Sequence, residues 1–298
     1  MFRIYFGKYL ENKGIITYQQ YHELLEQSKH KRVKLGLLAV EMDYMSKTEA
    51  EEVNHLQTVL DQRFGDIAVD KGYLTPDQVE RLLKKQGDPY MLFIQELTEN
   101  NIMSLEQIQK ELKNYKKAER FTALDLDAIK SGDIDNIVPV FTKEPSIAPV
   151  IKDYIALFAR NMIRFIDTQL RLENAVRINS YQADFMASQA MEGQYNMFIG
   201  ISGESDAIVD LASIYCKEQF EEVDEDVLDA VCEFINCNNG LFASKLSEED
   251  IDIDMLPPVM YTEKICIRSE GSMYKIPLYI SGEHLDLIIC METKWSIE

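Results

Sequence analysis

A repeat with a period of 29 residues governs the first third of the chain. Glycines recur at this spacing as Gly7, Gly36 and Gly65. The same period links four residues that tolerate a left-handed conformation at a helix C-terminus, namely Gly14, Asp43, Gly72 and Asn101. Three residues after each of these stands an N-cap residue, and three further on a Gln or Glu completes a capping box. These pairs are Thr17 and Gln20, Ser46 and Glu49, Thr75 and Gln78, and Ser104 and Gln107.

Each copy of the repeat is therefore predicted to form a short helix, a tight turn and a second, capped helix. A single helical hairpin cannot bury its apolar face, so the four copies are expected to pack together. We predict an all-α helical-hairpin repeat domain over residues 1–116. The fourth copy lacks the early glycine and is expected to cap the domain.

The charge is distributed unevenly along the chain. Residues 1–120 hold 18 Lys and Arg against 19 Asp and Glu, a net charge of −1, so the remaining residues carry −19 of the total −20. This asymmetry favours two domains, and the second is a poor binder of duplex nucleic acid. Solubility alone explains the acidity equally well.

Composition also bounds the location of the protein and its cofactors. No window approaches 18 uncharged apolar residues and the N-terminus does not resemble a signal peptide, so we predict a cytoplasmic protein without membrane insertion. The cysteines are odd in number, five, which favours reduced thiols. No histidine stands near a cysteine in ligand spacing, so we predict no metal site.

The second and third repeats resemble the N-terminal domain of type II secretion and pilus-assembly ATPases, the MshEN type. Two stretches of 24 residues, 34–57 and 63–86, are separated by five residues, and in that family tandem Arg-Leu-Gly…Gln motifs with this spacing bind cyclic di-GMP. The resemblance implies two sets of contacts with that ligand: Lys34, Leu35, Gly36 and Gln57, then Arg63, Phe64, Gly65 and Gln86.

This chain departs from the MshEN pattern at three positions. Lys34 cannot make the planar bidentate contact of an arginine, Phe64 replaces a leucine, and Asp43 replaces a turn glycine. The alternative is a helical scaffold that keeps the caps and binds no ligand. No GxxxxGK[ST] sequence occurs, so no ATPase core follows.

Residues 117–147 are predicted to form a connector between the two domains. Pro139 and Pro145 interrupt it, and residues 125–130 are expected to form one short helix. Ile137 and Phe141 belong to an apolar run that would not stay in water, so we expect the connector to be packed.

Residues 148–298 are predicted to form an α+β two-layer domain with a mostly antiparallel sheet and long helices. Helices are expected from Ala148 and over 205–217 and 224–246. Strands are expected over 175–178, 185–191, 195–202, 259–268, 273–280 and 285–291, with turns at Glu270-Gly271 and Gly282-Glu283.

The third of these helices carries the candidate chemistry. At about 100° per residue, Asp229, Glu233, Asn236 and Gly240 fall on one narrow polar stripe. The opposite face is expected to bury Val231, Phe234, Ile235, Leu241 and Phe242. A glycine inside a helix costs about 1 kcal/mol, which is consistent with close approach by another molecule. An acidic outer face is also common on surface helices, so the spacing alone leaves both interpretations open.

The pattern Asp-x3-Glu-x2-Asn, followed by Pro257-Pro258, resembles the CheC/CheX/FliY family of response-regulator phosphatases. The order of elements over residues 148–298 is similar, and the single copy of the motif resembles CheX. The resemblance implies that this helix enters the active site of a phosphorylated CheY-like receiver domain. Glu233 would pair with a lysine of the receiver, Asn236 would orient the attacking water, and Asp229 would support them. Magnesium would belong to the receiver, and the chain needs no cofactor of its own.

Three functions remain open at this point. The first is hydrolysis of the aspartyl phosphate of a response regulator, with cyclic di-GMP as a regulator bound by the N-terminal domain. The second is an adaptor that binds a receiver without catalysis. The third is a cyclic di-GMP effector in signalling or motility. The CheX resemblance also implies a homodimer, while the partner regulator and its pathway cannot be predicted.

Overall fold

The computed structural model describes residues 1–26, 32–60, 62–291 and 294–298. The chain divides into two compact units, residues 1–132 and 133–298. The division falls within the predicted connector, whose parts belong to one unit or the other. Among the described residues, no helix combines the length and the apolar composition that a membrane crossing requires.

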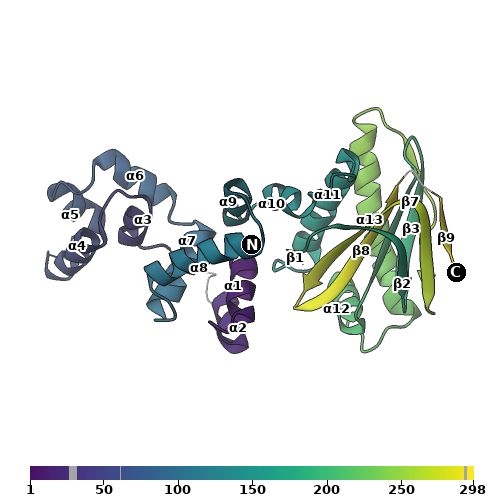
Figure 1. Ribbon diagram of the computed structural model, residues 1–298, viewed down its shortest axis with the longest axis horizontal. Coiled ribbons are helices and arrows are strands. Elements are labelled where there is room, and N and C mark those ends of the chain that lie inside the picture. Colours follow the sequence, from purple (N-terminus) through teal and green to yellow (C-terminus); the bar gives the residue numbers. More distant parts are fainter. Residues whose placement is uncertain (27–31, 61, 292–293) are drawn as a thin grey trace. The chain divides into compact units, whose positions relative to one another are not determined.

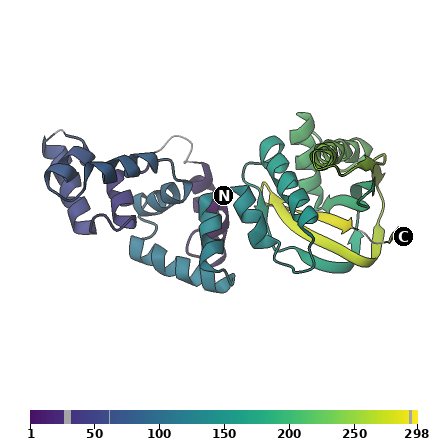
Figure 2. The same cartoon turned by 90° about the horizontal axis from the view of Figure 1, so that it is seen from above.

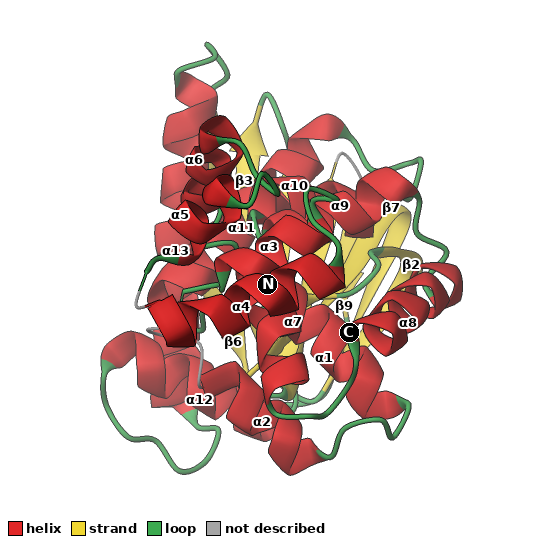
Figure 3. Cartoon of the chain, turned by 90° about the vertical axis from the view of Figure 1, so that its left-hand side faces the viewer, coloured by secondary structure: helices red, strands yellow, loops and turns green. Residues whose placement is uncertain are grey.

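The first unit consists of helices, drawn in red in Figure 3, that form the four predicted hairpins and one further helix. The hairpins are α1 (Phe2–Asn12) with α2 (Tyr18–Glu26), α3 (Leu35–Glu41) with α4 (Lys47–Leu60), α5 (Phe64–Asp70) with α6 (Pro76–Lys84), and α7 (Pro89–Glu99) with α8 (Leu105–Ala118). The further helix, α9 (Ala123–Ser131), confirms the predicted short helix and is capped by Thr122. The helical domain thus extends past residue 116.

The repeat pattern is confirmed in the backbone. All four predicted left-handed residues have positive φ: Gly14 (68°), Asp43 (53°), Gly72 (74°) and Asn101 (53°). All four capping boxes are formed; in the third, Thr75 accepts from the backbone of Gln78, whose side chain accepts from the backbone of Thr75. The equivalent bonds occur in the other copies. Each turn of the repeat is therefore fixed by residues local to it.

The hairpins associate in two pairs. Helix α3 packs with α5 and α6, and α4 packs with α5, which joins the second copy to the third. Helix α1 packs with α7 and α8, which joins the first copy to the fourth. Buried aromatic rings form this second contact; the centroids of Phe2 and Tyr90 are 4.8 Å apart and those of Phe2 and Phe93 are 6.2 Å apart.

The second unit is an antiparallel sheet with helices (Figure 1). Its helices are α10 (Ile134–Phe141), α11 (Pro149–Phe165), α12 (Ser205–Cys216) and α13 (Glu225–Ser247). Its strands are β1 (Arg171–Leu172), β2 (Val176–Ala183), β3 (Met186–Gly193), β4 (Met197–Gly203), β5 (Ile253–Met255), β6 (Val259–Tyr261), β7 (Ile265–Ile280), β8 (Glu283–Met291) and β9 (Trp295–Ile297). The predicted packing of the connector is confirmed by Ile137 and Phe141, which are buried in α10.

The described strands follow the order β1-β7-β8-β4-β3-β5, with β2 and β9 also paired to β7 and β6 paired to β3. Every pairing among them is antiparallel, in agreement with the predicted fold class. Helix α13 packs on β3, β5 and β6, and α12 packs on β4, β7 and β8. Figure 2 shows α13 nearly end-on beside the curled sheet.

One predicted turn is wrong. The chain does not reverse at Glu270-Gly271; β7 continues through both residues as a single strand of 16 residues. Its pairing with β2 shifts register between Ile178 and Ser180, so the strand bends there without ending. A glycine in an apolar strand marks a bulge or bend as well as a turn, and only the pairing of distant strands decides which occurs.

Candidate functional site

The polar stripe lies on α13, a helix whose start is fixed by Asp224. The Asp224 carboxylate accepts from the backbone N–H of Val227 at 2.9 Å. Asp229, Glu233 and Asn236 are exposed along the helix, as predicted from their spacing. The stripe therefore presents two carboxylates and one amide to the exterior.

The opposite face of α13 anchors the helix in the domain. Val231, Phe234, Ile235 and Phe242 are at most 1% exposed, which confirms their predicted burial. The prediction was wrong for Leu241, which is 46% exposed. At about 100° per residue it lies at the edge of the buried face, where neighbouring elements no longer cover it.

Asn236 is exposed, but its side chain is hydrogen-bonded to a buried residue of the sheet. Its Oδ1 accepts a hydrogen bond from Gln189 Nε2 at 2.7 Å. Gln189 lies in β3 and is 1% exposed. Burying an amide is costly unless its polar atoms are bonded, so this residue holds a defined position. Sequence reasoning missed Gln189, although a Gln inside the apolar stretch Met186–Met191 was a signal.

The Gln189 amide belongs to a larger buried set of polar groups. It also donates to the backbone carbonyl of Leu256 at 2.8 Å and accepts from Asn239 Nδ2 at 2.8 Å. Asn239 in turn accepts from the Tyr154 hydroxyl of α11 at 2.7 Å. The stripe is thus connected to the sheet, to α11 and to the segment after β5.

Two thiols near the stripe, Cys216 and Cys232, are poor nucleophiles. Burial, followed by the charges of Glu233 and Glu218, raises the pKa of Cys216. Burial raises the pKa of Cys232 to about 11. Because the thiolate is the reactive form, neither sulfur is suited to attack a phosphoryl group at neutral pH. Cys237 is exposed beside Asn236, so this part of α13 carries a thiol as well as the carboxylates and the amide.

Large apolar side chains are exposed close to the stripe. An added Cβ at Gly240 would lie 3.7 Å from Met255 Cε, so the glycine end of the stripe adjoins the segment after α13. The apolar residues exposed on α13 and on this segment are Leu241 (46%), Met255 (38%), Leu256 (37%), Val259 (46%) and Met260 (40%). Polar groups flanked by exposed apolar side chains are typical of a protein-binding face.

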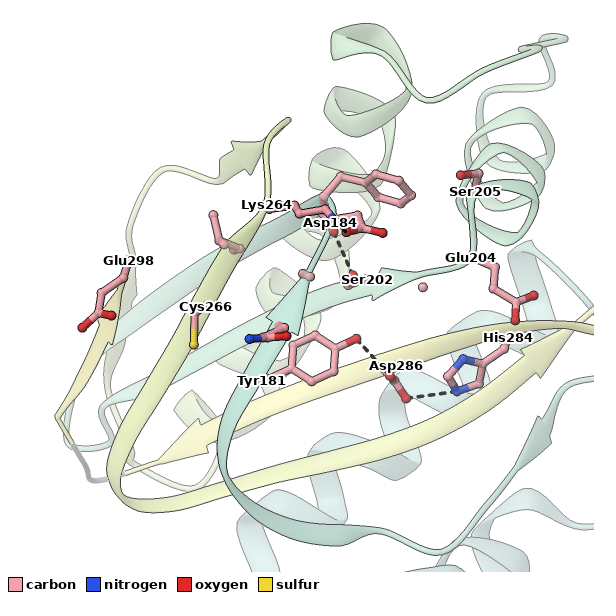
Figure 4. A pocket seen from close by; sticks show the side chains of 15 residues that line it. Tyr181, Asp184, Ser202, Glu204, Ser205, Lys264, Cys266, His284, Asp286 and Glu298 are labelled. Carbon is pink, nitrogen blue, oxygen red and sulfur yellow. Dashed lines mark hydrogen bonds and ion pairs between the residues drawn. The ribbon is translucent and has the colours of Figure 1, made fainter.

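A cavity of about 730 Å³ opens elsewhere in the second unit (Figure 4). Asp286, 5% exposed, accepts from the Tyr181 hydroxyl at 2.9 Å, and its other oxygen lies 3.1 Å from His284 Nε2. Burial and the adjacent Asp286 raise the pKa of Tyr181. Among the described residues, Tyr181 bonds one oxygen of this carboxylate while Oδ1 accepts no hydrogen bond, and no residue of the stripe lines the cavity.

The residues expected to bind cyclic di-GMP lie at the two central hairpins of the first unit. Lys34 and Arg63 are exposed N-cap residues of α3 and α5. Lys34 Nζ forms an ion pair with Glu99 at 2.7 Å. Leu35 is half-buried and Phe64 is buried.

Side chains of the protein itself occupy the space beside the two glycines of these motifs. An added Cβ at Gly36 would meet the Phe64 ring at 3.0 Å, and one at Gly65 would meet Val79 Cγ1 at 2.8 Å. Close helix packing therefore explains why glycine occurs at both positions.

The two glutamines of the motifs also contact the chain. Gln57 Nε2 donates to the carbonyl of Gln62 at 3.4 Å, and Gln86 Nε2 donates to the carbonyl of Val33 at 2.8 Å. Each glutamine thus supports the residue that precedes a motif. The structure brings Gln86 close to the start of the other motif, at Lys34.

No group of three or more His, Cys, Asp or Glu side chains suited to metal binding occurs among the residues described. All five cysteines are free.

Comparison with known proteins concerns the second unit. Residues 185–281 match the chemotaxis phosphatase CheX family. The matched segment runs from β3 to the end of β7 and includes the whole of α13, so the chain contains a CheX-like domain. No curated protein sequence matches the chain.

Several solved structures are similar to the chain at low identity. A CheC-like superfamily protein from Shewanella sp. PV-4 is 20% identical with a TM-score of 0.42, over 48% of this chain and 97% of that one. CheX from Vibrio vulnificus is 19% identical with a TM-score of 0.42, over 49% and 100%. A CheX–CheY–BeF3–Mg2+ complex from Borrelia burgdorferi is 16% identical with a TM-score of 0.37, over 48% and 97%.

Proposed function

We propose that the second unit hydrolyses the aspartyl phosphate of a CheY-like response regulator. The observation that carries this proposal is the exposed pair Glu233 and Asn236 on one face of α13, inside the segment that matches the CheX phosphatase family. The exposed apolar side chains beside the stripe support a protein as the substrate, because a small phosphate ester would not need them.

In the proposed reaction, α13 enters the receiver's active site and completes it. Glu233 pairs with a lysine of the receiver, and Asn236 holds a water in line with the phosphorus–oxygen bond. The water oxygen bonds to phosphorus, the bond to the aspartyl oxygen breaks, and the products are the free carboxylate and dihydrogen phosphate. Such a reaction needs positioning more than covalent chemistry. Asp229 lies one turn before Glu233 and is assigned a supporting role.

The test is release of phosphate from receiver domains of the same genome, charged with acetyl phosphate and mixed with the full chain. Wild-type protein should accelerate release from at least one receiver. Glu233→Gln should lose the acceleration, whereas Glu248→Gln, which removes the same charge at the end of the same helix, should keep it. Binding of a charged receiver without faster release would instead favour the adaptor function.

Cyclic di-GMP binding by the first unit stays a prediction of the MshEN resemblance. Calorimetry with cyclic di-GMP, on the full chain and on its Arg63→Ala variant, would test this prediction. Saturable binding whose free energy is weaker by about 1–3 kcal/mol in the variant would support a guanine contact. The homodimer and the cytoplasmic location also stay predictions, and light scattering would test the first.

A further inference from the structure

Four hydrogen bonds connect Asn236 to the interior of the CheX-like domain. In order, Asn236 Oδ1 accepts from Gln189 Nε2, which also donates to the Leu256 carbonyl; Gln189 Oε1 accepts from Asn239 Nδ2; and Asn239 Oδ1 accepts from Tyr154. Tyr154 and Asn239 are 0% exposed and Gln189 is 1% exposed. Water therefore does not compete for the bonds among these three side chains.

The direction of every amide in this series follows from one backbone group. A carbonyl oxygen can only accept, so the Leu256 carbonyl requires the nitrogen of the Gln189 amide to face it. The second hydrogen of that nitrogen points to Asn236, which must then turn its oxygen inward. The Gln189 oxygen likewise requires the nitrogen of Asn239, and the Asn239 oxygen requires a donor.

The Tyr154 hydroxyl supplies that donor. Burial raises the pKa of Tyr154, so the hydroxyl keeps its proton near neutral pH. The amide orientations are therefore independent of pH near neutrality. With its oxygen bound to Gln189, Asn236 has its Nδ2 amino group left to face the exterior.

We propose that Gln189 is a positioning residue for Asn236 and that the group Asn236 offers to the attacking water is an N–H donor. The inference rests on the proposed function and adds to it the direction of the amide. A donor engages one lone pair of the water oxygen and leaves the other for phosphorus. Because an amide nitrogen takes up no proton, Asn236 orients the water and does not act as a base.

The kinetic test compares Gln189→Met with Asn161→Leu in the full chain. Gln189→Met keeps the length of the side chain and removes the hydrogen bond that Gln189 donates to Asn236, together with its bonds to Leu256 and Asn239. Asn161→Leu removes a different buried amide contact between α11 and α13, the 2.7 Å bond from Asn161 to Asn238, and serves as the matched control.

We expect Gln189→Met to lower kcat by about 10- to 100-fold, because a misplaced reacting group slows a reaction by up to that factor. Its affinity for a receiver charged with beryllofluoride should stay unchanged. Asn161→Leu should keep kcat close to the wild-type value. Equal losses of kcat in both variants, or an unchanged kcat in Gln189→Met, would overturn the positioning role.

Hydrogen exchange of the Gln189 side-chain amide, followed by NMR without any receiver, tests the geometry separately. Both of its protons should exchange slowly in wild type, and one should exchange faster in Asn236→Ala. Rapid exchange in wild type would refute the fixed amide. Slow exchange in a protein that hydrolyses no phospho-receiver would refute the proposed function and the catalytic role, and would leave the fixed Asn236 as part of a binding surface.

Discussion

The motif residues of the first unit and the stripe residues of α13 differ in whether they contact the chain itself or remain available to a partner. In the first unit, neighbouring side chains occupy the space beside Gly36 and Gly65. The side chains of Gln57 and Gln86 donate to backbone carbonyls of the chain itself. On α13, Asp229, Glu233 and Asn236 face outward, and the inner side of Asn236 is bonded to Gln189. Residue types at the right spacing thus do not separate packing from recognition. What separates them is whether the polar atoms remain available once the chain has folded.

The largest expected effect would come from truncating the available group. Asn236→Ala should reduce accelerated dephosphorylation on the order of 100-fold, because one oriented contact in the transition state is lost. It should also cost about 1 kcal/mol in unfolding free energy, since a Gln189 N–H loses its partner. Phosphate release and urea unfolding measure the two effects.

Glu233→Ala is the companion to this experiment. It should abolish activity as well but change the unfolding free energy by no more than about 0.5 kcal/mol, as is usual for exposed positions. Full activity in either variant would contradict the contrast between the two regions, because the exposed polar atoms would then have no catalytic use.

Glycine substitution should give the next largest effect, with opposite signs in the two regions. Gly65→Ala places a methyl group 2.8 Å from Val79 Cγ1 and should destabilise the first unit by about 1–3 kcal/mol. Gly240→Ala meets only Met255 Cε at 3.7 Å and should stabilise α13 by up to about 1 kcal/mol.

The position of the single tryptophan allows these effects to be assigned. Trp295 lies in β9 of the second unit, so its fluorescence should follow Gly240→Ala, while circular dichroism should reveal the loss in Gly65→Ala. If Gly65→Ala were neutral, the glycine would not be needed for packing, and a role in ligand contact would regain support.

The smallest effect concerns the caps of the repeat. Thr75→Ala removes a complete capping box and should cost about 1 kcal/mol. Thr48→Ala makes the same chemical change at an exposed residue in the first turn of α4, next to but outside its capping box, and should change the free energy of unfolding by no more than about 0.5 kcal/mol. Thermal unfolding followed by circular dichroism would measure both; equal losses would show that Thr75 contributes no more than helix propensity.

The difference between local and long-range contacts explains how far the sequence could predict each region. In the first unit every turn depends on residues within six positions of one another, so a repeating pattern in the sequence was sufficient. The positive φ angles of Asp43 and Asn101 follow from the same register as those of the glycines. How the hairpins pair was not encoded locally, and the contact of the first with the fourth could not be anticipated.

In the second unit, α13 and its stripe could be predicted because a helix face repeats at a fixed angle. Leu241 could not, because its exposure depends on which segment covers the edge of the face. Nor could the role of Gln189, which is 47 residues from Asn236 in the chain. A side chain that supports a site from another element has no fixed spacing to it, and only the register of the sheet brings the two together.

The continuous course of β7 has a consequence for synthesis of the protein. This one strand pairs with β1, β2, β8 and β9, so the earlier strands β1 and β2 have no neighbour until residues 265–280 have left the ribosome. The first unit needs only residues 1–132, including the contact of α1 with α7 and α8, and these emerge before any strand of the sheet. The growing chain therefore passes through a stage in which the helical unit can be folded while β1 and β2 still lack the strand with which they pair.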